Sequence, residues 1–216
     1  MIAGTIAVVN RGCIDPALTA WLWRTAKWAP GVNLVLPDGE GGEITRGRNA
    51  GAEQLHGDFL LCVDSDCIPP DGALGQVLSY GLPLVGGLCM ERGQDELVCA
   101  TRTFEPTTRW ALEDLPESGV IPVLAVGTGF LLIRRPVLEA LGAPIFRCGQ
   151  LVLDALTEDT DFCLRAAEAG FPPYLDCGLR VGHRMVGLLW AHDDGQQWIQ
   201  WEASVYREPL NALVAA

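Results

Sequence analysis

The sequence predicts an α/β fold in which a mostly parallel, Rossmann-like sheet is flanked by helices. Short apolar runs without charge recur along the chain, and such runs are typical of strands buried on both faces of a parallel sheet. Helical patterns alternate with these runs, as expected of strand-helix-strand units. The predicted strands are Ile2 to Val9, Val32 to Leu36, Phe59 to Val63, Leu82 to Leu88 and Val123 to Ile133.

The first half of the chain predicts three helices between these strands. Pro16 suits the first turn of a helix that runs to about Trp28 with apolar residues at helical spacing. A second helix is expected from Glu43 to Leu55, directly before the central strand. Asp71 is the expected N-terminal cap of the third helix, which ends near Tyr80-Gly81.

The second half has weaker patterns. Residues 98–104 alternate like an edge strand, and residues 105–119 are polar and irregular, which predicts a loop. Gly127-Thr128-Gly129 lies inside the predicted strand Val123 to Ile133 and indicates a bulge or a close approach to a ligand, with tight packing as the alternative. A later helix opens at Thr157, a short strand is expected at Pro173 to Leu175, and the tail from Leu188 is expected to pack on the body.

Length and charge exclude several classes of protein. A chain of 216 residues can bury roughly 70% of its unfolded surface and needs no disulfide or metal to fold. Its formal net charge of -12 opposes non-specific attraction to nucleic acid or to an anionic membrane. No apolar stretch is long enough to span a bilayer and no signal peptide is recognisable, so we expect no integral membrane segment.

The 8 cysteines contain no C-x-x-C pair, and several lie inside apolar runs, where a free cysteine behaves as a small hydrophobic residue. Buried free thiols are therefore favoured over a zinc site or a disulfide framework. This use of cysteine indicates a reducing cytoplasm, or the host cytoplasm if the protein is viral.

Asp64-Ser65-Asp66 follows the central apolar run and precedes a Pro-Pro turn. Carboxylates at the carboxyl end of a buried strand lie where open α/β sheets bind ligands. Hard oxygen ligands in this arrangement suit Mg²⁺ or Mn²⁺ that carries a phosphorylated substrate. A solvated turn with two acidic residues is the alternative interpretation.

Two further groups of polar residues belong to predicted helix starts. Arg48 and Asn49 lie in the helix before the central strand, where an arginine could match a diphosphate if the face is not simply solvated. Glu158, Asp159 and Asp161 lie in one first turn, where the helix dipole favours acidic side chains. Three acidic groups exceed what capping requires.

The order of these features resembles the glycosyltransferases of the GT-A fold, especially compact bacterial or phage chains of the family-two type. The resemblance covers most of residues 44 to 183 and rests on three segments: GRNAGAEQLHGDFLLCVDSDCIPP, VGTGFLLIRRPVLEALG and TEDTDFCLRAAEAGFPPYLDCGLRVGH. It implies one catalytic domain over residues 1–216, with a nucleotide-sugar half at 1–88, an acceptor half at 89–183 and a tail at 184–216.

The resemblance also implies roles for single residues. Asp66 would bind a divalent Mn²⁺ or Mg²⁺, with Asp64 nearer the ribose or a metal-bound water and His183 as the late metal ligand. Asp159, next to Glu158 in the predicted catalytic pair, would be the general base of an inverting transfer. The metal would balance charge on the departing diphosphate.

The implied donor is a nucleoside diphosphate sugar, with a UDP-sugar expected. Arg48 and Asn49 would touch the nucleotide, and Asn10 with Arg11 would close the base and ribose pocket. Gly129 is counted with these donor-binding residues, and it would also floor the acceptor side together with Phe130. Asn-Arg-Gly replaces the commoner Pro-x-x-Asn after the first strand, so the base contacts depart from the family pattern.

The acceptor would be a hydroxyl on a glycan, lipid, protein or modified nucleobase, and the acidity of the chain disfavours DNA. Two other functions stay open at this point. A sugar-phosphate nucleotidyltransferase would need a glycine-rich basic loop after the first strand, of which residues 9–13 supply a fragment. A non-catalytic carbohydrate-binding protein would give Asp66, Asp159 and His183 no reason to converge.

Overall fold

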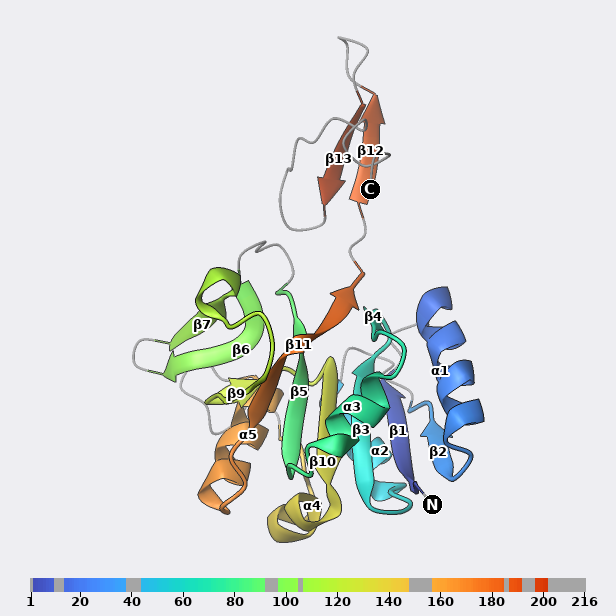
Figure 1. Cartoon of the computed structure of the whole chain (residues 1–216), viewed down its shortest axis with the longest axis vertical. Coiled ribbons are helices and arrows are strands. Elements are labelled where there is room, and N and C mark those ends of the chain that lie inside the picture. The colour runs from blue at the N-terminus through green and yellow to red at the C-terminus, as the bar shows by residue number, and fades with distance from the viewer. Residues whose placement is uncertain are drawn as a thin grey trace.

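The structure, a computed structural model, describes residues 2–9, 14–37, 44–91, 97–104, 107–147, 157–184, 187–191 and 197–201, the last two ranges by their backbone only. Its central layer is an 8-stranded sheet in which β2-β1-β3-β10-β5-β11-β4 lie in this order and β8 pairs with β11 (Figure 1). The strands are β1 Gly4–Val9, β2 Val32–Val35, β3 Phe59–Asp64, β4 Cys67–Ile68, β5 Leu84–Cys89, β8 Val120–Pro122, β10 Phe130–Arg134 and β11 Tyr174–His183.

The sheet is mixed, which corrects the prediction of a mostly parallel one. β1 runs parallel to β2 and β3, and β11 runs parallel to β5. β10, in contrast, lies between β3 and β5 and is antiparallel to both. An apolar run reveals that a strand is buried but not its direction, and for this reason the sequence pattern did not distinguish β10 from its neighbours.

Helices cover both faces of the sheet (Figure 1). Side chains of β3 alternate between two core clusters: Leu60 and Cys62 join one, whereas Phe59, Leu61 and Val63 join the other. Each such aliphatic or aromatic side chain contributes about 1.5–3 kcal/mol through burial. The helices are α1 Pro16–Trp28, α2 Ile44–Glu53, α3 Ala73–Ser79, α4 Arg135–Leu141 and α5 Glu158–Glu168.

Two glycines let α2 lie unusually close to β1. A Cβ atom built on Gly51 would be 2.6 Å from Cβ of Ala7, and one built on Gly47 would be 2.9 Å from Cγ1 of Val9. Real side chains do not approach so closely, so the contact requires glycine at both positions. This close contact brings Arg48, between the two glycines, over the carboxyl end of the sheet.

The helices predicted in the first half are present, with one correction at a cap. α3 begins after Gly72, which has a φ of 81°, and has no side-chain cap hydrogen bond. Asp71 was the expected cap, but its carboxylate instead accepts a hydrogen bond from Arg24 at 2.8 Å. A side-chain cap is instead found on α1, where Oδ1 of Asp15 accepts a hydrogen bond from the Ala17 amide at 2.7 Å.

The segment predicted as a loop contains part of a second sheet. β6 Leu97–Phe104 is the middle strand of the order β7-β6-β9, not an edge strand, and β7 Thr107–Ala111 lies within the predicted loop. A short 3-10 helix, η2 Leu112–Asp114, follows β7. The predicted strand Val123 to Ile133 divides into β9 Ala125–Val126 and β10, and residues 127–129 connect them.

The end of the described chain also differs from expectation. β11 continues past the predicted Leu175 to His183 and there pairs with β4. β12 Gly187–Ala191 and β13 Gln197–Trp201 form an antiparallel ribbon, which stands beyond the end of β11 in Figure 1. The remainder of the predicted tail lies outside the described residues.

Candidate functional site

The carboxyl end of β3 begins the site. Asp64 is the last residue of β3, and its amide donates a hydrogen bond to the Gly129 carbonyl at 3.1 Å. Gly129 comes just before β10, so the antiparallel neighbour strand starts where β3 ends. A Cβ at Gly129 would be 2.8 Å from Sγ of Cys67, so any side chain there would fill the space between these groups.

Arg48 is a buried cation at the centre of the site. Its side chain is only 3% exposed, and it contacts Asp64 at 3.1 Å and Glu158 through its other terminal nitrogen. Burial opposes the charge on the guanidinium, but the Asp64 and Glu158 carboxylates outweigh it and raise the pKa of Arg48 above its ordinary value. Arg48 therefore stays charged and joins β3 to the start of α5.

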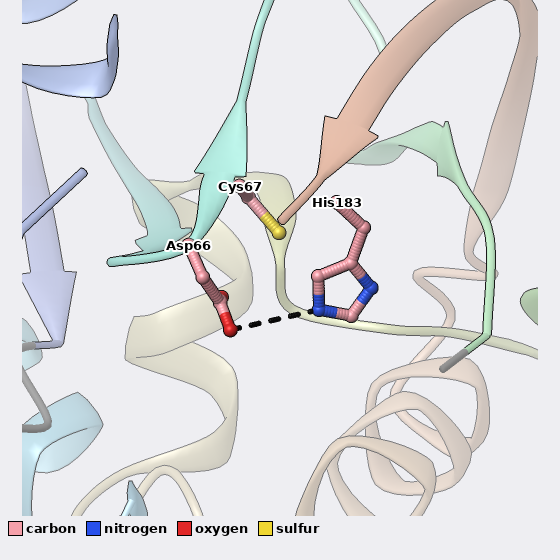
Figure 2. Close-up of side chains that lie close together, drawn as sticks. All are labelled: Asp66, Cys67 and His183. Atoms are coloured by element: carbon pink, nitrogen blue, oxygen red, sulfur yellow. Dashed lines mark ion pairs between the residues drawn. The ribbon is translucent and has the colours of Figure 1, made fainter. Parts of the chain in front are cut away.

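Asp66, Cys67 and His183 form a compact group of ligand types (Figure 2). One ligand atom from each lies within 4.8 Å of the other two, and Nε2 of His183 is 3.7 Å from Oδ2 of Asp66. The antiparallel pairing of β4 with β11 places His183 opposite Cys67. Two residues 116 positions apart in sequence thus become neighbours because the two strands pair.

The orientation of His183 is fixed by the backbone of residue 90. Nδ1 of His183 is 2.9 Å from the Met90 carbonyl oxygen, which can only accept, so Nδ1 carries the proton and donates it. In this tautomer the lone pair is on Nε2, the nitrogen that faces Asp66. A ligand histidine commonly has such an outer hydrogen bond, and the group fits a divalent metal ion.

Asp159 lies in the first turn of α5. Its Oδ1 accepts hydrogen bonds from the Thr160 amide at 2.8 Å and from the Thr157 hydroxyl. Its Oδ2 faces Gly127, since a Cβ built on that glycine would be 3.6 Å away. One carboxylate oxygen is thus held by the helix start, and the other is directed to the connection between β9 and β10.

These groups meet at one cavity of about 100 Å³. The lining side chains come from both sheets and from two helix starts: Arg48, Asp64, Cys67, Cys89, Glu91, Cys99, Arg109, Thr128, Asp159 and His183, together with Gly127 and Gly129. Thr128 is 1% exposed, and its Oγ1 has no hydrogen-bond partner among the described residues. A bound ligand could accept a hydrogen bond from such a hydroxyl or donate one to it.

Most of the predicted site residues come together here, but not all. Asn49 contacts the backbone of Phe146 through both its amide nitrogen and its amide oxygen and lines a different cavity. Glu158 forms an ion pair with Arg48. Asn10 and Arg11 lie outside the described residues.

The sequence patterns missed several lining residues. Cys67, Cys89 and Cys99 looked like ordinary apolar positions, yet Sγ of Cys67 is 3.9 Å from Sγ of Cys89. Arg109 belongs to β7, within the predicted loop, and pairs with Glu91 at 3.4 Å. Only Cys67 had a usable signal, because it directly follows the acidic motif.

The charge around the cavity favours a cation. Five carboxylates, those of Asp64, Asp66, Glu91, Glu158 and Asp159, surround two guanidinium groups, those of Arg48 and Arg109. Clustered carboxylates repel one another unless a positive charge compensates them. A divalent ion beside Asp66 and His183 would provide that compensation.

Comparison with known proteins locates the fold. No protein-family model matches the sequence, and a search of curated proteins gave no match either. The crystal structure of A197 from STIV is similar with a TM-score of 0.62 at 18% identity, covering 94% of this chain and 96% of that one. The chain shares the fold of A197.

Two other solved structures have lower similarity. GalNAc-T7, solved with UDP, GalNAc and Mn²⁺, has a TM-score of 0.49 at 16% identity, covering 82% of this chain and 37% of that one. A protein described as a glucose-1-phosphate thymidylyltransferase from Bacillus anthracis, in complex with a sucrose, has a TM-score of 0.41 at 14% identity, covering 81% and 70%. Both TM-scores are too low to show that this chain shares a fold with either protein.

Among the described residues, no helix has both the length and the apolar character needed to cross a membrane.

Proposed function

We propose that this chain is a metal-dependent, inverting glycosyltransferase that transfers a sugar from a nucleoside diphosphate sugar, with a UDP-sugar expected, to a hydroxyl acceptor. The proposal rests on one observation, which is that acidic and histidine side chains from distant parts of the sequence lie at one cavity. Asp64, Asp159 and His183 are far apart in sequence but line one cavity, and Asp66 is 3.7 Å from His183. A non-catalytic carbohydrate-binding protein gives no reason for this arrangement.

In the proposed reaction, Asp66 and His183 would hold the divalent ion, Mn²⁺ or Mg²⁺. When bound, that ion supplies positive charge against the developing charge of a leaving diphosphate. Arg48 adds a second fixed positive charge at the end of β3. Its ion pair with Asp64 also holds that carboxylate in place for the donor side of the pocket.

Asp159 is the proposed general base. Its Oδ1 is held by Thr157 and Thr160, so Oδ2 is the oxygen that can accept a proton from an acceptor hydroxyl. The neighbouring Gly127 and Gly129 have no side chains, so an acceptor can approach close to the backbone. Because Arg48 engages Glu158, that carboxylate positions Arg48 instead of taking the proton.

Donor binding is tested by thermal unfolding of the full chain with nucleotides and nucleotide sugars, each with and without Mn²⁺. A ligand at 100 times its dissociation constant stabilises the native state by about 2.7 kcal/mol. For a chain of this length, each kcal/mol raises the Tm by about 2–4 °C. We expect a shift with a uridine nucleotide and Mn²⁺ together, and no shift with any nucleotide would refute the proposal.

Asp66→Ala should remove the Mn²⁺-dependent part of this shift, because only His183 would remain of the two proposed ligands. Asp71→Ala is the matched control: its carboxylate is 73% exposed and pairs with Arg24 on the surface, so its shift should equal that of the wild type. Equal shifts in Asp66→Ala and the wild type would exclude Asp66 as a metal ligand.

Asp159→Asn should leave the donor-induced shift intact but lower transfer by a factor of about 10²–10⁴, the usual contribution of a general base. Asp161→Asn in the same helix turn removes the same charge and serves as the control. Transfer is measured as nucleoside diphosphate released with acceptor present. A fully active Asp159→Asn variant, or retained anomeric configuration in the product, would contradict the mechanism.

A further inference from the structure

The candidate metal site contains a sulfur atom that the proposed chemistry does not use. Mg²⁺ and Mn²⁺ prefer oxygen ligands, of which Asp66 supplies one, and neither prefers a thiolate. Cys67 is completely buried, its ligand atom lies within 4.8 Å of the other two, and it lines the cavity. Its thiol therefore faces the position that a metal ion held by Asp66 and His183 would take (Figure 2).

The geometry suits a small tetrahedral ion. Zn²⁺ binds sulfur at about 2.3 Å and nitrogen or oxygen at about 2.0–2.2 Å, which separates its ligand atoms by roughly 3.3–3.8 Å. Nε2 of His183 and Oδ2 of Asp66 are already 3.7 Å apart. The upper limit of 4.8 Å for the other pairs means that side-chain adjustments of about an ångström would complete three protein ligands.

The backbone holds these ligands in place. Asp66 and Cys67 are consecutive, and the β4–β11 pairing fixes Cys67 opposite His183. The Met90 carbonyl keeps the lone pair of His183 on Nε2. Cys89, whose Sγ is 3.9 Å from that of Cys67, is close enough to donate its S–H to a metal-bound thiolate.

We infer that Cys67 is a third metal ligand and that the site binds Zn²⁺, Co²⁺ and Cd²⁺ in preference to Mg²⁺ or Mn²⁺. On binding, the Cys67 S–H bond breaks, the proton goes to solvent and a metal–sulfur bond replaces one metal–water bond. Thiolate ligands select such ions, and Zn²⁺ exceeds Mn²⁺ in intrinsic affinity for most sites. Where it concerns catalysis, the inference rests on the proposed function: Zn²⁺ would displace the catalytic ion and inhibit transfer.

Titration of the full chain with Co²⁺ and Cd²⁺, without nucleotide, tests the inference. A metal–thiolate bond produces a charge-transfer absorption in the near ultraviolet, and we expect this band to saturate at one metal per chain. Cys67→Ala should abolish the band and weaken binding at least about tenfold, since even loss of an outer hydrogen-bond partner typically costs 10–100-fold in affinity. His183→Ala should weaken binding to a similar extent.

Two control variants keep the assignment specific. Cys89→Ala removes the adjacent thiol, and Cys177→Ala removes a buried thiol of the core; both should keep the band. A wild-type chain without the band, or a band that survives in Cys67→Ala, overturns the inference. Cys67→Ser provides a second test if the alanine variant does not fold, because a hydroxyl gives no such band.

The outcome is separable from that of the proposed function. A chain that binds a uridine nucleotide with Mn²⁺ but shows no thiolate band overturns the inference alone. A chain that shows the band but binds no nucleotide supports the inference and removes the proposed function. If both hold, Zn²⁺ should reduce the Mn²⁺-dependent thermal shift of the wild type at least about ten times more effectively than that of Cys67→Ala.

Discussion

At the scale of single residues, one buried arginine connects the two acidic parts of the site. Arg48 comes from α2, whereas Asp64 ends β3 and Glu158 begins α5. A buried ion pair gains little over an apolar replacement, but its disruption leaves uncompensated charges out of water. The structural role of Arg48 is therefore to make a cluster of carboxylates compatible with the interior.

Arg48→Met should lower the free energy of unfolding by about 3–5 kcal/mol, because Asp64 and Glu158 would then face each other without a cation. Urea denaturation followed by circular dichroism measures this cost. Arg102→Met is the control, because Arg102 pairs with Asp114 at the surface, where the side chains are 47% and 45% exposed. Its cost should stay within about 1 kcal/mol, and equal costs would mean that Arg48 is not central.

Only some of these side chains stand out in the sequence. Asp64, Asp66 and Asp159 attract attention because acidic residues at strand and helix ends are unusual; the structure places Asp64 and Asp159 at one cavity and Asp66 beside His183, and their roles stay predictions. The burial of Arg48 could not be predicted, because a charged side chain on a helix normally faces solvent. Cys67 was concealed for the opposite reason: a cysteine in an apolar context looks like packing until a partner strand brings His183 beside it.

At the scale of elements, the contact between α2 and β1 determines how far α2 reaches over the sheet. Its glycines are costly for an isolated helix, since each is about 1 kcal/mol less favourable than alanine. The close approach at Gly47 and Gly51 explains why they occur there. The two glycines lower the intrinsic stability of α2, but the close contact that they allow places Arg48 beside Asp64 at the end of β3.

Gly51→Ala should therefore destabilise the protein by about 1–3 kcal/mol through overpacking against Ala7, in spite of the better helix propensity of alanine. Gly75→Ala in α3 is the matched control. A Cβ there meets only the ring of Trp28, at 3.3 Å, and this side chain is 56% exposed and can move. Denaturant unfolding should show a neutral or stabilising effect for Gly75→Ala; the same sign for both variants would contradict the packing argument.

The elements were predictable in proportion to their local signals. β1, β3, β5, α1 and α2 follow from apolar runs and helix starts, and each is close to its predicted position. β7 was not predicted, because five residues of mixed polarity show little periodicity. The direction of β10 and the extension of β11 to His183 depend on pairing between distant strands, which no local pattern encodes.

At the scale of the whole molecule, an ion pair joins the end of β11 to the start of α1 beside the loop that carries Asp66. Arg184, just after β11, donates to Oδ2 of Asp15 at 2.6 Å. The backbone amides of the same two residues donate to the carbonyls of Asp66 and Ser65, at 2.8 and 3.0 Å. The start of α1 and the end of β11 therefore both support the loop that carries Asp66.

The hydrogen bond from Arg184 lowers the pKa of Asp15 below its ordinary value of 3.8. A lowered pKa stabilises the fold at every pH above that ordinary value, and the stabilisation is lost as the pH falls through the lowered pKa. Asp15→Asn keeps the helix cap, since asparagine caps equally well. It should cost about 1 kcal/mol at pH 7, because Arg184 is 54% exposed although the Asp15 side chain is only 8% exposed.

The difference in unfolding free energy between Asp15→Asn and the wild type should be constant from pH 5 to 8, about one unit and more above the ordinary pKa, and should shrink below it. Arg184→Gln is the partner control, and combining both changes should cost little more than either alone. A loss that persists unchanged in acid would assign the effect to the cap, not to the charge pair.

Because β10 lies antiparallel between β3 and β5, the chain between β5 and β10 begins and ends at the same edge of the sheet. β5 ends at Cys89 and β10 begins at Phe130, and these strands are direct neighbours in the sheet. The intervening stretch, which contains the small second sheet and β8, thus leaves and re-enters the central sheet at adjoining points. Glu91, Cys99 and Arg109 of this stretch line the cavity, so exchanging their side chains would alter one wall of the cavity while Asp64 stays at the end of β3.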